Sequence, residues 1–189
     1  MSFKFKPLTP ARWHDFETLF GKNGACGGCW CMTWRIALKE FREKKGAGNK
    51  RAMKKLVESG VQPGILAYAG PEPVGWISIA PREQFTRLAG SKVLAPLDDQ
   101  PVWSVTCFFV RKDFRNQGLT VELLNAAAEF AHKKGAKIVE GYPYDLKEKL
   151  PPPFVWTGLS SSFVNAGFRE AARRSKTRPI MRRPLSDHP

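Results

Sequence analysis

The sequence lacks any apolar run long enough to cross a bilayer, and its first residues lack the apolar core of a secretory signal peptide. We therefore expect no membrane-spanning helix, no membrane partner and a cytoplasmic location. The chain has only four cysteines. In a reducing compartment these should stay thiols rather than pair as disulfides.

Acidic side chains are scarce, with 17 Asp and Glu against 31 Lys and Arg, which gives a formal net charge of +14. The positive excess lies mainly in residues 39–55 and 169–183. Such a surface attracts polyanions of every kind, phosphorylated cofactors included. Charge runs are usually solvated faces, however, so charge alone does not indicate specific nucleic-acid binding.

The cysteine segment, residues 26–35, reads CGGCWCMTWR and holds three of the four cysteines. Its C-x-x-C spacing suits zinc, but a closed structural site needs four ligands. The fourth would have to be His14, His132 or Cys107, and no second pair has the usual spacing, so we expect no metal. A redox pair is disfavoured because the segment does not open a helix after a strand. The three histidines form no catalytic pattern.

Hydrophobic periodicity predicts helices and strands that alternate along one α+β domain, residues 1–189, without a repeat or an interdomain linker. Residues 102–110, VWSVTCFFV, should form a strand buried on both faces. The expected strands are 3–8, a hairpin within 65–81, 102–110, 136–142 and two weak strands after 168. The expected helices are 9–20, 36–44, one capped by Asn49, 118–134 and about 160–166, the last after a proline-rich loop at 150–154.

The loop after the strand 102–110 reads RNQGLT, residues 115–120, and leads into a helix. A helix N-terminus offers unpaired N–H donors and a partial positive charge, so it binds phosphate well. Gly118 permits close backbone approach, and Arg115 adds a cation. The residues alone also fit an ordinary strand–helix turn that contains a glycine.

This loop and the order of elements around it resemble the GNAT superfamily of N-acetyltransferases. The family loop reads Arg/Gln-x-x-Gly-x-Gly/Ala, and this chain differs only at Thr120. The sequence also resembles a bacterial subgroup with a CWCM segment, a GYP strand end and an F-x-W-x-G…GF…RRS-x-TRPIMR ending. The resemblance covers nearly the whole chain. It implies a single GNAT-like domain whose mixed central sheet, flanked by helices, splays between the central strand and the following one.

The resemblance further implies acetyl-CoA as acyl donor, no metal, and direct acetyl transfer to a primary amine of a small molecule or a protein. The cofactor half would span about 102–142, and the acceptor pocket about 21–60 and 143–167. Homodimers are common in the family, so a homodimer is possible. The implied cofactor-binding residues are Phe108, Phe109, Val110, Arg115, Asn116, Gln117, Gly118, Leu119 and Thr120.

The acid and base of the reaction are less clear, because many family members have a tyrosine where this chain has Phe163. Glu140 and Tyr142 alternate on one strand and share a face, so Glu140 is a candidate base and Tyr142 a candidate proton donor. Alternatively, Tyr142 packs in the sheet and Glu140 is solvated or paired. Cys107 and Tyr144 are further candidates, although Cys107 in an apolar strand is expected to be buried packing.

The cysteine segment would border the acceptor pocket in this resemblance. We expect an apolar slot with a possible carboxylate anchor at Arg35. The slot residues would be Cys29, Trp30, Cys31 and Trp34. In the alternative interpretation the tryptophans belong to the core and Arg35 is a surface cation.

A second function also fits the sequence. The chain could be a basic binding module that kept the fold and lost catalysis, and Thr120 and Phe163 favour this alternative. Its partner would be nucleic acid or an acidic protein.

Overall fold

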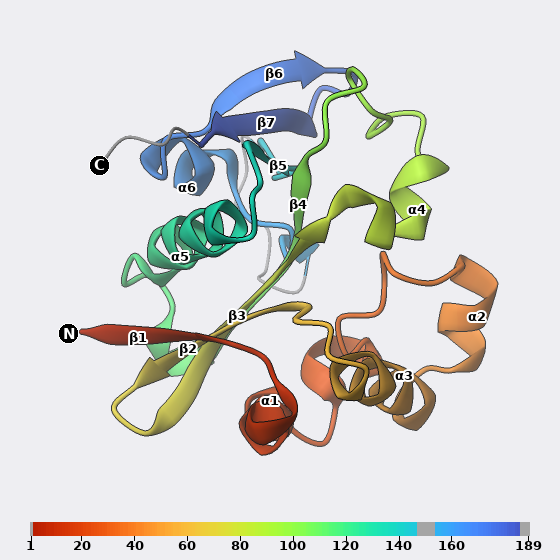
Figure 1. Cartoon of the computed structure of the whole chain (residues 1–189), viewed down its shortest axis with the longest axis vertical. Coiled ribbons are helices and arrows are strands. Elements are labelled where there is room, and N and C mark those ends of the chain that lie inside the picture. Colours follow the sequence, from red (N-terminus) through yellow and green to blue (C-terminus); the bar gives the residue numbers. More distant parts are fainter. Residues whose placement is uncertain (1, 147–153, 186–189) are drawn as a thin grey trace.

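The computed structural model describes residues 2–146 and 154–185. Seven strands form one sheet in the order β1-β2-β3-β4-β5-β7-β6, in which β4 and β5 are parallel and the other neighbours antiparallel (Figure 1). The strands are β1 Phe3–Pro7, β2 Gly64–Ala69, β3 Glu72–Pro81, β4 Trp103–Val110, β5 Ile138–Gly141, β6 Arg169–Arg173 and β7 Pro179–Pro184. The predicted α+β class and mixed sheet are confirmed.

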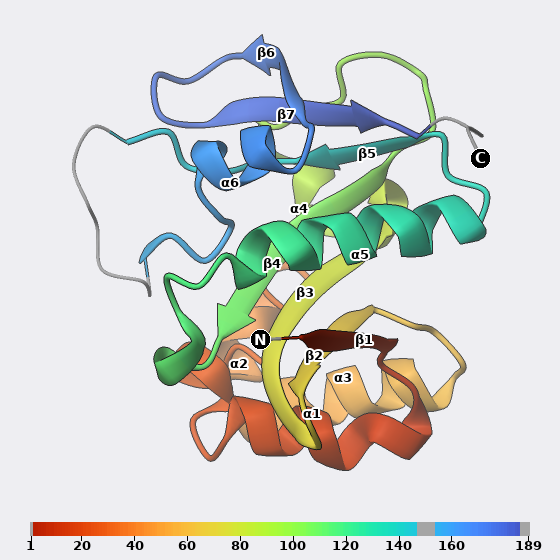
Figure 2. The same cartoon turned by 90° about the vertical axis from the view of Figure 1, so that its left-hand side faces the viewer.

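Helices cover both faces of this sheet. In Figure 2, α5 and α6 lie on the near side and α1, α2 and α3 lie below and behind. The helices are α1 Trp13–Phe20, α2 Leu38–Glu43, α3 Ala47–Glu58, α4 Thr86–Ala89, α5 Leu119–Lys133 and α6 Ser160–Asn165. The expected helices are all present, and α4 is an additional helix that the sequence did not predict. Of the proline-rich loop expected at 150–154, residues 150–153 lie outside the described residues.

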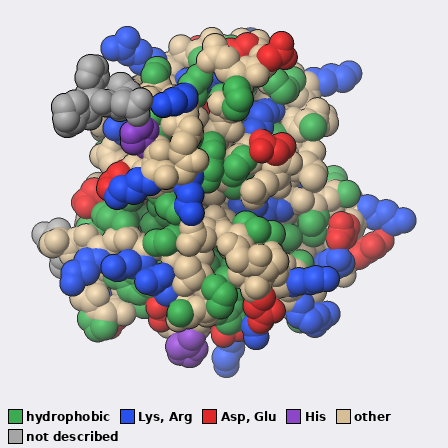
Figure 3. Space-filling model, viewed as in Figure 1, with side chains coloured by type: hydrophobic (Ala, Val, Ile, Leu, Met, Phe, Trp, Pro, Cys, Tyr) green, Lys and Arg blue, Asp and Glu red, His purple; other side chains and the backbone are tan. Residues whose placement is uncertain are grey.

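Charged side chains are spread over the surface. On the face shown in Figure 3, Lys and Arg are interleaved with Asp and Glu rather than gathered in one patch. Several form exposed ion pairs, such as Arg111 with Glu72 at 2.8 Å and Arg173 with Asp145 at 2.7 Å. Across the described residues, no helix combines the length and the apolar character needed to span a membrane.

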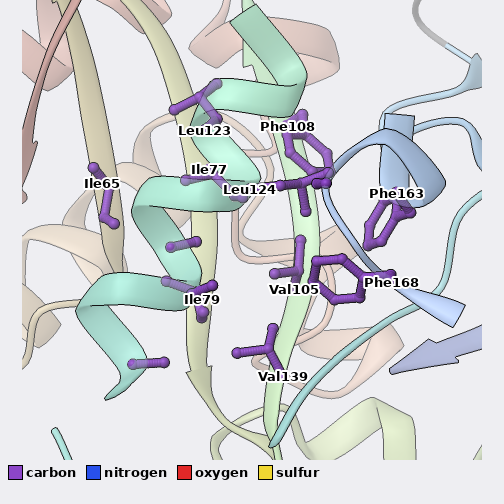
Figure 4. Packing of buried hydrophobic residues seen from close by; sticks show 14 of the residues in the cluster. Ile65, Ile77, Ile79, Val105, Phe108, Leu123, Leu124, Val139, Phe163 and Phe168 are labelled. Carbon is purple, nitrogen blue, oxygen red and sulfur yellow. The ribbon is translucent and has the colours of Figure 1, made fainter. Parts of the chain in front are cut away.

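The central strands are buried on both faces. Along β2, Ile65 and Ala67 pack in the cluster that contains α5, whereas Leu66 and Tyr68 pack with α1 and α3. This alternation follows from the two-residue period of a strand. Figure 4 shows Leu123 and Leu124 of α5 on the same side of the sheet as the isoleucines of β2 and β3.

One predicted helix cap was wrong. Asn49 does not cap α3, because the helix already begins at Ala47. The Asn49 side chain is buried, and its amide nitrogen donates to the carbonyl oxygens of Gly28 at 3.2 Å and Phe41 at 3.3 Å. The side chain therefore ties α3 to the cysteine segment.

The sheet splays between β4 and β5, as the resemblance implied. These strands pair only through residues 103–105 and 139–141, and then β5 ends while β4 continues to Val110. A bulge lies at the same level. Ser78 pairs with Cys107 and Ile79 pairs with Val105, so Thr106 has no opposite residue on β3. Bulges bend a strand and redirect its side chains.

Two groups hold the strands apart. The backbone N–H of Phe108 donates to the carbonyl oxygen of Trp156 at 2.7 Å, so β4 is paired with a loop where β5 would continue. The Phe163 ring lies edge-to-face with Phe108 and Phe168, with ring centroids 6.0 and 5.0 Å apart (Figure 4). A Cβ atom on Gly141 would come within 2.1 Å of this ring.

We expect Gly141→Ala to lower the free energy of unfolding by ~1–3 kcal/mol, the usual cost of overpacking a core. The added methyl group would collide with Phe163, whose ring is fixed by its two phenylalanine neighbours. Urea unfolding of the single variants and of the double variant with Phe163→Leu measures the coupling between the sites. Phe163→Leu should recover part of the Gly141→Ala loss, and strictly additive losses would contradict this packing.

Candidate active site

A cavity of about 680 Å³ opens where β4 leaves β5. Its walls come from the end of β4, the loop 114–121, the turn before and within the cysteine segment, and residues 155–162. On the side of α5 it is lined by Phe108, Val110, Phe114, Arg115, Asn116, Gly118, Leu119, Thr120, Val121, Gly158, Leu159 and Ser162. On the side of α1 and α2 it is lined by Phe20, Ala25, Cys26, Gly27, Cys29, Thr33, Phe41, Lys45, Cys107 and Phe109. Val155 and Trp156 also line it.

The start of α5 has free N–H groups and a left-handed turn, the features of many anion-binding helix ends. Asn116 has φ 60° and Gly118 φ 80°, a left-handed conformation that glycine adopts readily and asparagine tolerates. In the described part of the chain, the N–H groups of Gly118, Leu119 and Thr120 donate no hydrogen bond, since the first helical bonds are those of Val121 and Glu122 to the Gly118 oxygen. These free donors add to the positive end of the helix dipole.

The charges around the cavity suit a polyanion. Arg115 and Lys45 line it, and none of its described lining residues is Asp or Glu. The Nε atom of Arg115 donates to the Val110 carbonyl oxygen at 2.9 Å, which fixes the guanidinium between the end of β4 and the start of α5.

The predicted cofactor residues come together here. All except Gln117 line the cavity; the Gln117 amide nitrogen donates to the Asp113 carbonyl oxygen at 2.8 Å instead. The N–H of Phe108 is already bonded to Trp156, so it is not free for a ligand.

The sequence profile of the acetyltransferase (GNAT) family matches residues 30–142, which is more than half of the chain. The chain belongs to the GNAT acetyltransferase family. No curated protein sequence matches this chain significantly.

Solved structures show the same fold at low sequence identity. A PaiA N-acetyltransferase from Thermoplasma acidophilum in complex with coenzyme A is 13% identical, with a TM-score of 0.55 over 98% of this chain and 100% of that one. A GNAT-family acetyltransferase from Listeria monocytogenes is 11% identical, with a TM-score of 0.60 over 97% and 95%. A ribosomal-protein-S5-alanine acetyltransferase from Vibrio fischeri is 9% identical, with a TM-score of 0.58 over 99% and 95%.

The predicted acceptor residues divide between the cavity and the core. Cys29 lines the cavity, whereas Trp30, Cys31 and Arg35 are buried behind its wall. Trp34 is half-buried and lies 6.0 Å from the Trp156 ring, measured between centroids. Burial raises the pKa of the Cys29 thiol, which favours its neutral form at the cavity wall.

Glu140 and Tyr142 do not line the cavity. They lie in a buried polar cluster on the face of the sheet opposite to α5. Glu140 Oε1 accepts from Arg82 at 3.0 Å, and Oε2 accepts from Arg182 at 2.7 Å. The Tyr142 hydroxyl hydrogen bonds to Glu140 at 2.7 Å, to Ser104 at 2.8 Å and to Arg82. Burial, and then the negative charge of Glu140, raises the pKa of Tyr142. This is the paired arrangement that the sequence left open.

Sequence reasoning did not assign several residues that line the cavity. Cys107, a further candidate in the sequence, is buried as expected, and it also lines the cavity. Cys107 faces the cavity because the bulge at Thr106 breaks the alternation of side chains along β4. The uniformly apolar sequence 102–110 gives no sign of this bulge. Trp156 and Ser162 lie within the predicted acceptor segment 143–167, of which residues 147–153 lie outside the described residues.

The cysteine segment has a C-x-x-C spacing that suits zinc. Among residues 2–146 and 154–185, no three His, Cys, Asp or Glu side chains are grouped so as to hold a metal ion. The four cysteines are free thiols.

We expect Glu140→Ala to lower the free energy of unfolding by ~3–5 kcal/mol, because two arginines would lose their buried carboxylate partner. Glu129→Ala is the matched control. Among the described residues Glu129 pairs with Lys133 on the exposed face of α5, and its removal should cost less than ~1 kcal/mol. Chemical denaturation measures both. Equal, small losses would place Glu140 in a solvated setting and leave it available for catalysis.

Proposed function

We propose that this protein transfers an acetyl group from acetyl-CoA directly to a primary amine. The observation that carries the proposal is the single cavity that joins the free N–H groups at the start of α5 to the chamber beside the cysteine segment. The end of the cavity at the start of α5 suits the phosphates of the acyl donor. The end beside the cysteine segment leaves space for an acceptor. The gap between β4 and β5 joins the two ends.

Some residues of the cavity would bind the cofactor, and others would position its acyl group. The N–H groups of Gly118, Leu119 and Thr120, together with Arg115, would hold the pyrophosphate. The backbone of β4 from Phe108 to Val110 would run along the acyl arm and position the reacting carbonyl. The rings of the chamber exclude water, which strengthens every polar interaction at the reacting centre.

The chamber on the cysteine side favours an amine carried on an apolar, aromatic body. Aromatic rings line it: Phe20, Phe41, Phe109 and Trp156. Among the described residues, Lys45 is the cation that lines the cysteine side of the cavity. It would attract a carboxylate rather than a second amine. A polyamine would find no acidic partner among the described lining residues. Arg35, the predicted carboxylate anchor, is buried outside the cavity.

The features that favoured an inactive binding module do not close the site. Thr120 lines the cavity, and its backbone N–H donates no hydrogen bond within the described residues. Phe163 is fully buried against Phe108 and Phe168, so its ring belongs to the core that supports the splay. Any proton transfer must therefore use other groups.

We expect Gly118→Glu to weaken acetyl-CoA binding by at least ~100-fold, which corresponds to ~2.7 kcal/mol. A carboxylate would stand at the anion site. The fold has room for it, because, apart from the two adjoining residues, no atom of the described residues lies within 4 Å of the position that a Cβ atom would take at residue 118. Calorimetric titration with acetyl-CoA measures the affinity.

Gly135→Glu is the matched control for this variant. Gly135 has φ 87° against 80° for Gly118, also has open space at its Cβ position, and follows the opposite end of α5. Both variants carry the same left-handed backbone penalty. Gly135→Glu should keep the affinity of the unaltered protein, and equal affinities in the two variants would remove the anion site from this loop.

The aromatic lining of the acceptor chamber predicts a preference among acceptor amines, which a panel of amines tests. We expect phenylalanine and tryptophan to release coenzyme A thiol from acetyl-CoA at a higher kcat/KM than spermidine does. A thiol-reactive dye follows the release. Lys45→Glu should narrow or reverse this preference, and a strong preference of the unaltered protein for spermidine would contradict the assigned chamber chemistry.

A further inference from the structure

Arg87 is held beside the wall of the acceptor chamber. It belongs to α4, and its Nη1 atom donates to the Thr33 carbonyl oxygen at 2.6 Å. Its backbone N–H donates to the Trp34 carbonyl oxygen at 3.2 Å. Thr33 lines the cavity, and Arg87 itself lies just outside it. The residues that form the wall of the chamber therefore fix the position of this arginine.

The guanidinium of Arg87 lies over an aromatic ring. Its Cζ atom is 5.3 Å from the centre of the Trp34 ring, and that ring is 6.0 Å from the Trp156 ring, measured between centroids. Trp156 lines the cavity. A planar guanidinium stacked on a ring is already oriented, so it loses little freedom when it binds an anion. The two indole rings thus lead from the cavity to an oriented cation.

One edge of this guanidinium is free to bind a ligand. Nη1 is bonded to Thr33, whereas Nε and Nη2 of Arg87 donate no hydrogen bond to any described residue. Neither of these two atoms is buried, so a ligand can reach them. A carboxylate accepts two parallel hydrogen bonds from such an edge. The free edge of Arg87 therefore fits a carboxylate.

No acidic side chain neutralises the positive charge at this place. Arg87, Arg42 and Lys45 form no ion pair with a described residue. Burial, and then the charge of Arg42, lowers the pKa of Arg87, so a second guanidinium lies nearby. Lys45 lines the cavity on the cysteine side. Charges of one sign around a cleft raise the local concentration of ligands of the opposite sign.

The position of Arg87 outside the cavity decides what kind of acceptor reaches it. In a free amino acid the amine and the carboxylate share one carbon atom, so both groups stay together inside the chamber. An extended peptide advances by ~3.5 Å per residue. A side chain on its second or third residue can therefore pass the Trp156 and Trp34 rings and reach Arg87.

We propose that the acceptor is the N-terminal amine of an acidic peptide, and that Arg87 binds the carboxylate of its second or third residue. This inference rests on the proposed function and names the substrate class of the same site. The first residue of the peptide is apolar or aromatic, because Phe41, Phe109 and Trp156 line the chamber that holds it. Arg87 determines specificity by touching the acceptor at a distance from the reacting atoms.

The transfer is the one already proposed, and it balances for a peptide amine. The acetyl carbon exchanges its bond to the coenzyme A sulfur for a bond to the N-terminal nitrogen of the peptide. The proton that the amine loses ends on the coenzyme A thiol. Arg87 takes no part in this exchange, so its charge acts on the binding of the acceptor.

Arg87 also ties α4 to the cysteine segment, and a purely structural role would affect every acceptor alike. Acceptors that differ only in charge separate the two roles. Phe-Glu-Gly and Phe-Gln-Gly, both with an amidated C-terminus, differ at the second residue. Phe-Gly-Glu and Phe-Gly-Gln, amidated in the same way, differ at the third. Amidation removes the terminal carboxylate, so each acidic peptide carries a single one.

We expect the unaltered protein to use the acidic peptide at least ~10-fold better than its amide partner, in kcat/KM, at one of the two positions. Arg87→Gln should remove most of this preference, because the loss falls on the acidic peptide and not on the amide. Release of coenzyme A thiol measures the rates. Equal kcat/KM for acidic and amide peptides at both positions in the unaltered protein would overturn the inference without any variant.

Arg51→Gln is the matched control. Arg51 is an exposed arginine on α3 that does not line the cavity, and its replacement lowers the net charge by the same amount. This variant should keep the preference for the acidic peptide. An equal loss of preference in both variants would show that general attraction to a basic surface selects the peptide, which would contradict a role for Arg87.

The outcomes separate this inference from the proposed function. Absence of acetyl-CoA binding, together with absence of thiol release from every amine, would refute the proposed function. Calorimetric titration of the unaltered protein and Arg87→Gln with the acidic peptides would still decide whether Arg87 binds the carboxylate. Turnover of free phenylalanine without any preference between the acidic and amide peptides would refute the acidic acceptor and leave the acetyltransferase standing.

Discussion

The structure depends on the separation of β4 from β5 after three paired residues. The hydrogen bond from Phe108 to the Trp156 carbonyl occupies the position that β5 would take, and the Phe163 ring fills the space over Gly141. If the strands stayed paired, β4 would be sealed along its length and the free N–H groups at the start of α5 would face no cavity. A few contacts in the core thus create the space in which chemistry takes place.

The bulge at Thr106 connects this separation to the cysteine side of the cavity. Val105 packs toward α5, but beyond the bulge Cys107 and Phe109 point to the side of α1 and the cysteine segment. The cavity therefore reaches both faces of the sheet. Trp30 and Cys31 approach from that side in left-handed backbone conformations, with φ 42° and φ 58°.

Much of the fold was predictable, and so was the position of the glycine loop before α5, because local rules determine both. Periodicity located the strands and helices, and glycine before a helix marked the loop at Gly118. The acid–base assignment was not predictable. Glu140 and Tyr142 do share one face, but whether that face meets a cavity or two arginines depends on β7, which is distant in sequence. The bulge at Thr106 likewise leaves no mark in a uniformly apolar strand.

The central claim is that free N–H groups at the start of α5 hold the phosphates of acetyl-CoA. Amide-resolved hydrogen exchange tests it most directly, since the N–H groups of Gly118, Leu119 and Thr120 have no partner among the described residues and should exchange rapidly in the free protein. The account predicts that saturating acetyl-CoA slows exchange at these three amides more than at the C-terminal end of α5. Saturable binding that leaves their exchange unchanged would contradict it.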